Sequence, residues 1–503
     1  MTSPETNSAE ALAQQASQWH RQGRLKDAAG LFEQVLQREP MRATAWHELA
    51  YVYKALGAYS EALHAFAQAL EHGMARPWEI HLDRAILCAD ALRLDVQARD
   101  ELHAALQCKA DYLPALLNLG NWHEQHGDRT AALDCYQRVL QLPNPQPANL
   151  RWVALARSAI IEPPSQADDP RFSDLERALT QVGQDPQVRP HLLFALGHGL
   201  DAVGRYDDAF EAYAKGNRSL LRASGRRHDR RQVEALTDAF IGAFSEPASS
   251  RSADAGEGPA PLFICGMFRS GSTLLEQVLA AHPQICAGGE LDWLLRTAAQ
   301  RLAPFPQSMQ RVSDSLLRQL AGEYRAHLRT LFPDAPADGY LTDKRADNFQ
   351  LIGFIKCLFP SARIIHTVRQ PLDNALSVFM QNINLDVASY AHDLGDIGHY
   401  YGQYRRLMQH WQSLYPGSIH DFDYDAFVDD PEPQLRALLD ALQLPWAPQC
   451  LQFHQLRNAV KTASYWQIRR PLYRGSSGRW RHYTDHLAPL RQSLREAGIN
   501  TAD

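Results

Sequence analysis

The stretch PLFICGMFRSGSTLLEQVLAAHPQICAGGE, residues 261–290, decides the fold of the C-terminal half of the chain. It begins with a short apolar run at residues 261–266, which is typical of a buried parallel strand. A loop of the form GxxxxG-S-T follows, and then an amphipathic helix that ends near Pro283. A glycine loop between a strand and a helix N-terminus can hold an anion, because backbone N–H groups and the helix dipole point toward it. The segment therefore predicts a phosphate-binding loop in an α/β domain.

The residues of this loop indicate which kinds of anionic ligand it can bind. We expect Gly271 to turn backbone N–H groups toward an anion, and Ser272 and Thr273 to add hydroxyl donors. The related ATP-binding loop carries a lysine directly before Ser/Thr, whereas this chain has Ser272 there, and its cation is Arg269. A nucleotide kinase or NTPase is therefore a weaker alternative, as is a glycine turn without a ligand.

A second strand–helix junction lies about 100 residues further on. Residues 363–381, RIIHTVRQPLDNALSVFMQ, predict a buried strand, a turn and a helix, with Arg369 at the strand end and Ser377 eight residues later. A guanidinium grips a phosphate through two parallel hydrogen bonds, and a hydroxyl adds orientation. Because ligands of parallel sheets bind outside the carboxyl ends of the strands, both junctions can face one crevice.

These segments resemble the sulfotransferase family, in particular its tyrosylprotein-sulfotransferase-like group. The first is similar to the family's 5′-phosphosulfate-binding region, through Arg269, Ser270, Gly271, Ser272, Thr273, Leu274, His282, Pro283, Gly289 and Glu290. The second is similar to its 3′-phosphate-binding motif, through Arg369 and Ser377. Further similar stretches are the family's lysine-bearing segment at 341–365, its Tyr-Glu/Asp…Asp-Pro segment at 423–446 and, more loosely, its nucleotide-closing loop, with Ser464 and Arg474.

The resemblance implies sulfuryl transfer from 3′-phosphoadenosine 5′-phosphosulfate (PAPS) to an acceptor hydroxyl. Glu290 would then be the general base, while Arg269 and Lys344 would stabilise the transferring group and the departing phosphate oxygen. The donor-binding residues would be Arg269, Ser270, Gly271, Ser272, Thr273, Arg369, Ser377, Ser464 and Arg474. No metal is expected, because the sequence offers no Cys/His cluster. Structural alternatives are that Glu290 caps the next helix and that Lys344 is a solvated charge.

The N-terminal part has a helical pattern with a period near 34 residues. A small residue is followed four positions later by a large apolar one in each unit: Ala28/Phe32, Ala62/Phe66, Ala98/Leu102 and Ala132/Tyr136. Gly23, Gly57 and Gly127 stand where one helix must turn into the next. The pattern resembles tetratricopeptide repeats, and residues 190–218 repeat it once more.

Composition excludes several other classes of protein. The formal net charge of −6 gives no reason to expect nucleic-acid binding. Seven cysteines without a CxxC pair predict neither a disulfide framework nor a zinc site. The first residues lack the features of a signal peptide, and no apolar run reaches the ~18 residues of a membrane span. We therefore expect a cytoplasmic protein that binds neither membrane nor nucleic acid.

The predicted architecture is an α-solenoid followed by an α/β sulfotransferase domain with a central parallel sheet. We expect repeats over 10–145, a further degenerate helical repeat over 146–241, a linker over 242–260 and the sulfotransferase domain over 261–503. The expected acceptor is a tyrosine in a peptide or protein, and the repeats are a candidate for holding that peptide or protein. A carbohydrate, lipid or small phenol acceptor, a scaffold with an inactive nucleotide-binding domain, and a homodimer contact made by the repeats stay open.

Overall fold

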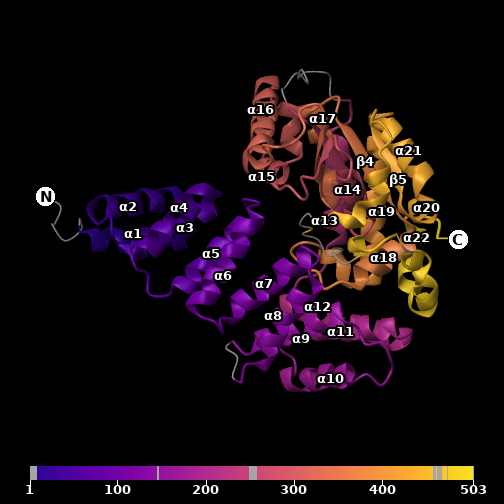
Figure 1. Ribbon diagram of the computed structural model, residues 1–503. Helices are drawn as coiled ribbons and strands as arrows, with labels where there is room; N and C mark the ends of the chain where they lie inside the picture. The colour runs from indigo at the N-terminus through magenta and orange to yellow at the C-terminus, as the bar shows by residue number, and fades with distance from the viewer. Residues whose placement is uncertain are drawn as a thin grey trace. The chain divides into compact units, whose positions relative to one another are not determined.

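The computed structural model describes residues 8–143, 147–247, 258–456, 460, 467–472 and 474–501. The chain divides into two compact units. One holds residues up to 124 together with 128–154, and the other holds residues 125–127 together with 155–503. Figure 1 traces both units from the indigo N-terminus to the yellow C-terminus.

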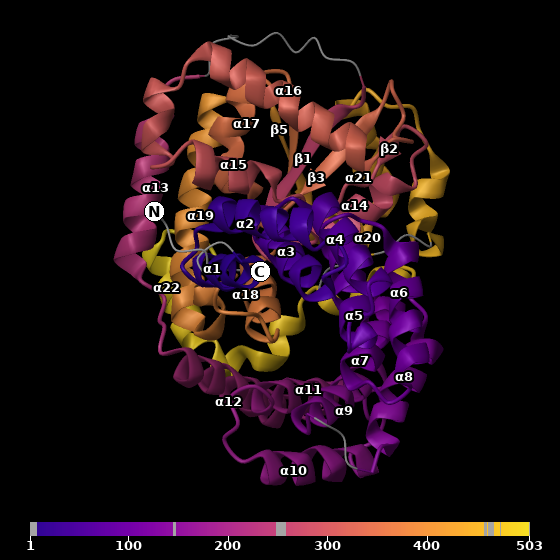
Figure 2. The ribbon, with the colours of Figure 1, turned by 90° about the vertical axis from the view of Figure 1, so that its left-hand side faces the viewer.

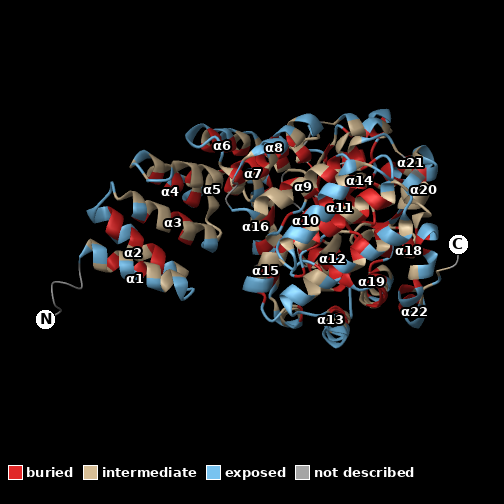
Figure 3. Ribbon diagram, turned by 90° about the horizontal axis from the view of Figure 1, so that it is seen from below, coloured by how far each residue is buried: buried red, intermediate tan, exposed pale blue. Residues whose placement is uncertain are grey.

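The first unit is a series of helices joined by short turns. They are α1 (Ala9–Arg21), α2 (Leu25–Arg38), α3 (Ala43–Leu56), α4 (Tyr59–Glu71), α5 (Pro77–Asp90), α6 (Asp95–Cys108), α7 (Leu113–Gln125) and α8 (Arg129–Gln141). The predicted turn glycines Gly23, Gly57 and Gly127 all have left-handed backbone angles, with φ of 77 to 78°. In Figure 3 the buried residues of α1 to α4 lie along the contacts between neighbouring helices.

Glycine lets paired helices of the repeats approach closely. A Cβ atom added at Gly120 on α7 would lie 2.5 Å from the ring of Tyr136 on α8. The same pairing recurs in the second unit, where a Cβ at Gly197 would lie 2.8 Å from the ring of Tyr213. Both tyrosines are buried. The glycine and the tyrosine 16 positions later are thus complementary in shape.

The second unit begins with helices and continues into an α/β domain. After α9 (Asn149–Ile161), which starts in the first unit, come α10 (Pro170–Val182), α11 (Arg189–Ala202), α12 (Tyr206–Ser224) and α13 (Arg230–Ala243). The strands are β1 (Ala260–Gly266), β2 (Ile285–Cys286), β3 (Tyr340–Lys344), β4 (Arg363–Val368) and β5 (Ile419–Asp423). The later helices are α14 (Ser272–Ala280), α15 (Trp293–Arg301), α16 (Asp314–Leu331), α17 (Ile352–Leu358), α18 (Pro371–Phe379), α19 (Leu394–Leu414), α20 (Tyr424–Asp429), α21 (Pro431–Ala441) and α22 (Ala488–Glu496).

The five described strands form one parallel sheet in the order β2-β3-β1-β4-β5. Along β1, Leu262 and Ile264 face one core, and Phe263 and Cys265 face the other, because successive side chains of a strand point to opposite faces. Figure 2 shows β1 and β3 between α14 and α21 on one side and α15, α16 and α17 on the other. Burial on both faces explains why β1 is a continuous apolar run.

Helices α12 and α13 pack on the α/β domain. Asn217 of α12 is buried and donates through Nδ2 to the Phe379 carbonyl oxygen at 2.8 Å. Beyond the end of α13, Phe244 packs against Trp411, with ring centroids 5.6 Å apart. The linker expected over 242–260 lies largely outside the described residues, since 248–257 are not described.

Membrane-spanning helices and clustered metal ligands are both absent from the described residues. No helix among them is both long enough and apolar enough to cross a membrane. Likewise, the described part of the chain contains no group of three or more His, Cys, Asp or Glu side chains arranged to hold a metal ion.

Candidate active site

The order of the strands creates a crevice at the carboxyl end of the sheet. After β1 the chain turns to α14 and the β2–β3 side, whereas after β4 it turns to α18 and β5. The connections that leave β1 and β4 therefore diverge, which is where parallel α/β sheets bind ligands. Arg269 follows β1 and Arg369 follows β4, so the two junctions singled out in the sequence meet at this point.

The loop after β1 is packed tightly between the end of β4 and Tyr424. On one side, the Ser270 and Thr367 hydroxyl oxygens lie 2.6 Å apart, within hydrogen-bond distance. On the other, a Cβ added at Gly271 would lie 2.4 Å from Tyr424 Cδ2, and Gly271 has a φ of 101°. No larger residue fits at Gly271 without displacing Tyr424. The loop thus presents the N-terminus of α14, with Ser272 and Thr273, to the crevice.

Arg369 is a buried cation that forms no ion pair with the described residues. Its side chain is at the end of β4, and the residue is 9% exposed. Nη1 donates to the Arg269 carbonyl oxygen at 3.2 Å, Nη2 donates to the Ser476 carbonyl oxygen at 2.6 Å, and the guanidinium lies 4.8 Å from the centre of the Tyr424 ring. Within the described residues Arg369 makes no ion pair, and its Nε is buried without a hydrogen-bond partner. A guanidinium in this state suits an anionic ligand.

Arg269 and Ser377 contact each other directly. Arg269 has a φ of 68°, which is rare for a residue with a side chain, and its Nε donates to Ser377 Oγ at 3.2 Å. The sequence interpretation paired Ser377 with Arg369 on one phosphate. In the structure Ser377, on α18, accepts this hydrogen bond from Arg269, and its role at a phosphate stays a prediction.

Lys344 and Glu290 form an ion pair at the edge of the site. Lys344 Nζ donates to Glu290 Oε1 at 2.7 Å, with the lysine side chain 1% exposed and the glutamate side chain 44% exposed. The backbone N–H of Lys344, the last residue of β3, donates to the Gly289 carbonyl oxygen at 2.9 Å. Lys344 is therefore a buried partner of Glu290 and not a solvated charge, whereas the Glu290 side chain is partly exposed.

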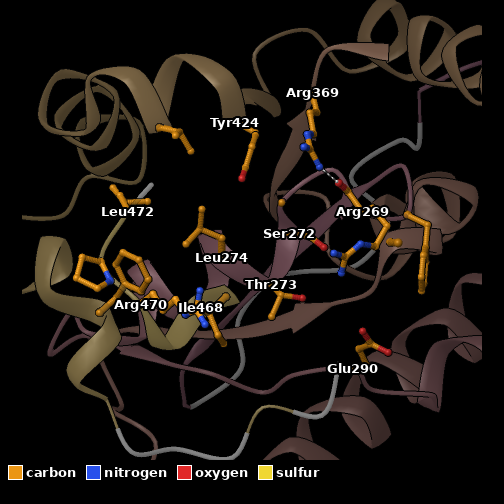
Figure 4. A pocket seen from close by; sticks show the side chains of 16 residues that line it. Arg269, Ser272, Thr273, Leu274, Glu290, Arg369, Tyr424, Ile468, Arg470 and Leu472 are labelled. Carbon is orange, nitrogen blue, oxygen red and sulfur yellow. Dashed lines mark hydrogen bonds between the residues drawn. The ribbon is translucent and has the colours of Figure 1, made fainter. Parts of the chain in front are cut away.

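A pocket joins the loop after β1, the end of β4 and Glu290. Its polar end is lined by Arg269, Ser272, Thr273, Glu290 and Arg369. Its apolar end is lined by Leu274, Tyr424, Val428, Phe453, Ile468 and Leu472. Figure 4 shows Arg269 and Arg369 joined by a hydrogen bond, Glu290 across the pocket from Arg369, and Leu274, Tyr424 and Leu472 grouped at the other end.

The structure describes the side chains of most, but not all, of the predicted donor-binding residues. The Ser270 hydroxyl lies within hydrogen-bond distance of the Thr367 hydroxyl and so supports the loop, but Ser270 does not line the pocket. Ser464 lies outside the described residues, and Arg474 begins a short 3₁₀ turn whose first side chain is not described. The sequence analysis assigned no role to Tyr424 or Arg470, which both line the pocket. Tyr424 could have been found from the segment 423–446, and Arg470 from the stretch between Ser464 and Arg474 that resembles the nucleotide-closing loop.

Comparison with known proteins gives matches in both parts of the chain. Residues 261–448 match the sulfotransferase family, and residues 20–77 and 115–149 match tetratricopeptide repeats. An uncharacterized protein of Aquifex aeolicus (strain VF5) is 31% identical over 361 residues, which are 68% of this chain and 47% of that protein. Protein-tyrosine sulfotransferase A of Caenorhabditis elegans is 23% identical over 231 residues, or 42% of this chain and 58% of that protein. The chain thus spans about half the length of the curated relatives it matches.

Solved structures similar to this chain are more distant. The sulfotransferase domain of the Synechococcus PCC 7002 olefin synthase is 20% identical, with a TM-score of 0.37, and the match covers 49% of this chain and 97% of that one. The sulfotransferase STF9 of Mycobacterium avium is 15% identical, with a TM-score of 0.29, and the match covers 67% of this chain and 97% of that one.

Proposed function

Because the C-terminal half of the chain carries a sulfotransferase-family domain and the N-terminal part carries tetratricopeptide repeats, we propose that the protein is a sulfotransferase that uses PAPS. One observation carries the proposal. Arg269, Glu290 and Arg369 line a single pocket, and Lys344 is bound to Glu290. The site thus combines cations for an anionic donor with a carboxylate that can accept a proton.

The pocket fits the chemistry of PAPS. Arg369, whose buried Nε has no hydrogen-bond partner, and the N-terminus of α14 suit its phosphate and sulfate groups. The apolar end, with Leu274, Tyr424 and Leu472, suits the adenine ring.

The proposed reaction is an in-line displacement at sulfur. The acceptor oxygen forms a bond to the sulfur atom, the bond from sulfur to the 5′-phosphate oxygen breaks, and the acceptor proton passes to Glu290. Arg269 and Lys344 stabilise negative charge on the transferring group and on the departing oxygen. The ion pair at 2.7 Å holds the Glu290 carboxylate in place, so positioning is a main contribution of the protein.

For the acceptor we propose a tyrosine side chain in a peptide or protein. Two observations support this choice: the 23% identity to the C. elegans protein-tyrosine sulfotransferase, and the repeats, which as a class hold extended polypeptide. A carbohydrate, lipid or small phenol is the alternative. We also propose a cytoplasmic location, on the basis of the sequence composition.

Calorimetry tests the donor assignment. Wild type should bind 3′-phosphoadenosine 5′-phosphate (PAP) without magnesium, and Arg369→Ala should bind it far more weakly. Arg436→Ala is the matched control, because Arg436 pairs with Glu432 on the surface of α21. Failure of the wild type to bind PAP would overturn the proposal. Radiolabelled transfer to a tyrosine peptide, with the same peptide carrying phenylalanine as the blank, then tests the acceptor.

A further inference from the structure

A second carboxylate, Glu276, lies buried next to the Lys344–Glu290 pair. It belongs to the middle of α14 and is 4% exposed, although a glutamate is normally found at the surface. Its Oε1 accepts two hydrogen bonds, from the Gly289 backbone N–H at 2.9 Å and from the Thr342 hydroxyl at 2.7 Å. Both partners belong to the segments that carry the ion pair.

The turn at residues 288–290 depends on these hydrogen bonds because its two glycines have no side chains to anchor it. A Cβ at Gly288 would lie 2.1 Å from the Thr342 carbonyl oxygen, and Gly289 has a left-handed φ of 67°. The Gly288 N–H donates to Thr342 Oγ1 at 3.0 Å. The Thr342 hydroxyl thus receives one hydrogen bond from the turn and passes one to Glu276.

The charge of this cluster also connects Glu276 to the ion pair. Burial raises the pKa of Glu276, and the nearby Lys344 ammonium acts in the opposite direction. The charged or titratable groups that face Glu276 are Lys344 on β3, Glu290 on the turn and Cys286 on β2. Lys344 therefore lies near two carboxylates, one buried and one half-exposed.

We propose that Glu276 is a positioning residue for the transfer reaction. It anchors the turn at 288–290 to α14 and β3, and so fixes the Glu290 carboxylate against Lys344. This inference rests on the proposed role of Glu290 as the base. The same helix begins at the phosphate-binding loop, so Glu276 joins the donor-binding and proton-accepting parts of the site through one rigid element.

Kinetics of three variants test this role. Glu276→Ala removes both hydrogen bonds, and we expect kcat to fall about 100-fold, the effect of a small misplacement of a reacting group. The KM for PAPS should stay near that of the wild type. Glu276→Gln keeps an oxygen at the same position and should restore most of kcat. Gln277→Ala is the control, because Gln277 is the next residue of α14, is equally buried and takes no part in this network.

A second readout does not need turnover. Crystal structures of Glu276→Ala and of Thr342→Val with PAP bound should show the turn displaced and the 2.7 Å contact between Lys344 and Glu290 lost. Thr342→Val has nearly the same shape as the wild type, and therefore serves if Glu276→Ala does not fold. A wild type that binds PAP but transfers no sulfuryl group would overturn the proposed function. The crystal structures would still show whether Glu276 holds the turn at 288–290 in place. An unmoved turn in both variants, or unchanged kcat in Glu276→Ala, would overturn the positioning role.

Discussion

Arg369 Nη1 donates a hydrogen bond to the backbone oxygen of Arg269, 3.2 Å away, and this bond ties the end of β4 to the loop after β1. The two arginines come from junctions 100 residues apart in the chain. Arg369, the cation that we assign to the donor's phosphate, is bonded to the backbone of Arg269. It therefore also fixes the conformation of the loop after β1. Arg269 keeps its unusual φ of 68° in this arrangement.

A lysine at position 369 should not replace the arginine. Arg369→Lys keeps the charge, but a single ammonium cannot reach both the Arg269 and Ser476 carbonyl oxygens and still contact a phosphate. We expect PAP affinity to fall at least about tenfold, or 1.4 kcal/mol, in calorimetric titrations. Arg436→Lys is the control for the same exchange at a surface position. Wild-type affinity in Arg369→Lys would mean that charge alone suffices there.

The two strand–loop–helix junctions could be predicted because their signals are local. β1 is an apolar run, β4 contains the apolar pair Ile364 and Ile365, and Gly271 and Pro371 mark the starts of the helices that follow. The pairing of Lys344 with Glu290 could not be predicted in the same way. The two residues are 54 positions apart and meet only because β3 lies between β1 and β2 in the sheet.

Polar residues in the core were the main feature that could not be predicted from the sequence. Periodicity treats Glu276 and Gln277 as the polar face of an amphipathic helix, yet both are buried. The Gly289 N–H and the Thr342 hydroxyl satisfy Glu276, and neither is adjacent to it in sequence. Phe244 shows the opposite case. It lies in a segment that composition marks as a linker, but it is buried against Trp411.

Gly120→Ala should destabilise the repeat that contains α7 and α8. The new methyl group would lie 2.5 Å from the Tyr136 ring, whose hydroxyl is held by Asn121 and Glu124. We expect a local loss of about 1–3 kcal/mol from overpacking. Hydrogen exchange followed by mass spectrometry should show faster exchange in peptides from α7 and α8. Gly30→Ala is the control, because no atom lies within 4 Å of a Cβ there and alanine favours a helix, so exchange should not increase.

Asp343 should make stability depend on pH between about 4 and 7. Burial raises the pKa of Asp343 to about 7, although hydrogen bonds from Tyr324 and Asn348 oppose the rise. In this range the unfolded state loses the proton while the folded state keeps it, so this carboxyl lowers the free energy of unfolding as pH rises. Asp343→Asn cannot ionise. Its stability relative to wild type should therefore improve by up to about 4 kcal/mol from pH 4 to pH 7 in urea unfolding.

A flat difference between Asp343→Asn and wild type over this pH range would show that Asp343 ionises normally in the folded protein. Asp174→Asn provides the comparison, because Asp174 forms an ion pair with Arg177 on α10 in which both side chains are at least 49% exposed. Its effect on stability should be small and should lack this pH dependence, as expected for an exposed ion pair.

Glu290→Gln should abolish most of the transfer while leaving donor binding intact. The amide cannot accept the acceptor's proton, and general-base catalysis contributes roughly 100- to 10,000-fold, so kcat should fall by that factor. An amide oxygen can still receive the hydrogen bond from Lys344, which keeps the buried ammonium satisfied and the fold stable. Asp292→Asn is the control, since Asp292 is two residues away, more exposed and paired with Arg296. PAP affinity should be the same in all three proteins. If Glu290→Gln retained wild-type kcat, another group would have to accept the proton, and the Lys344–Glu290 pair would be structural only.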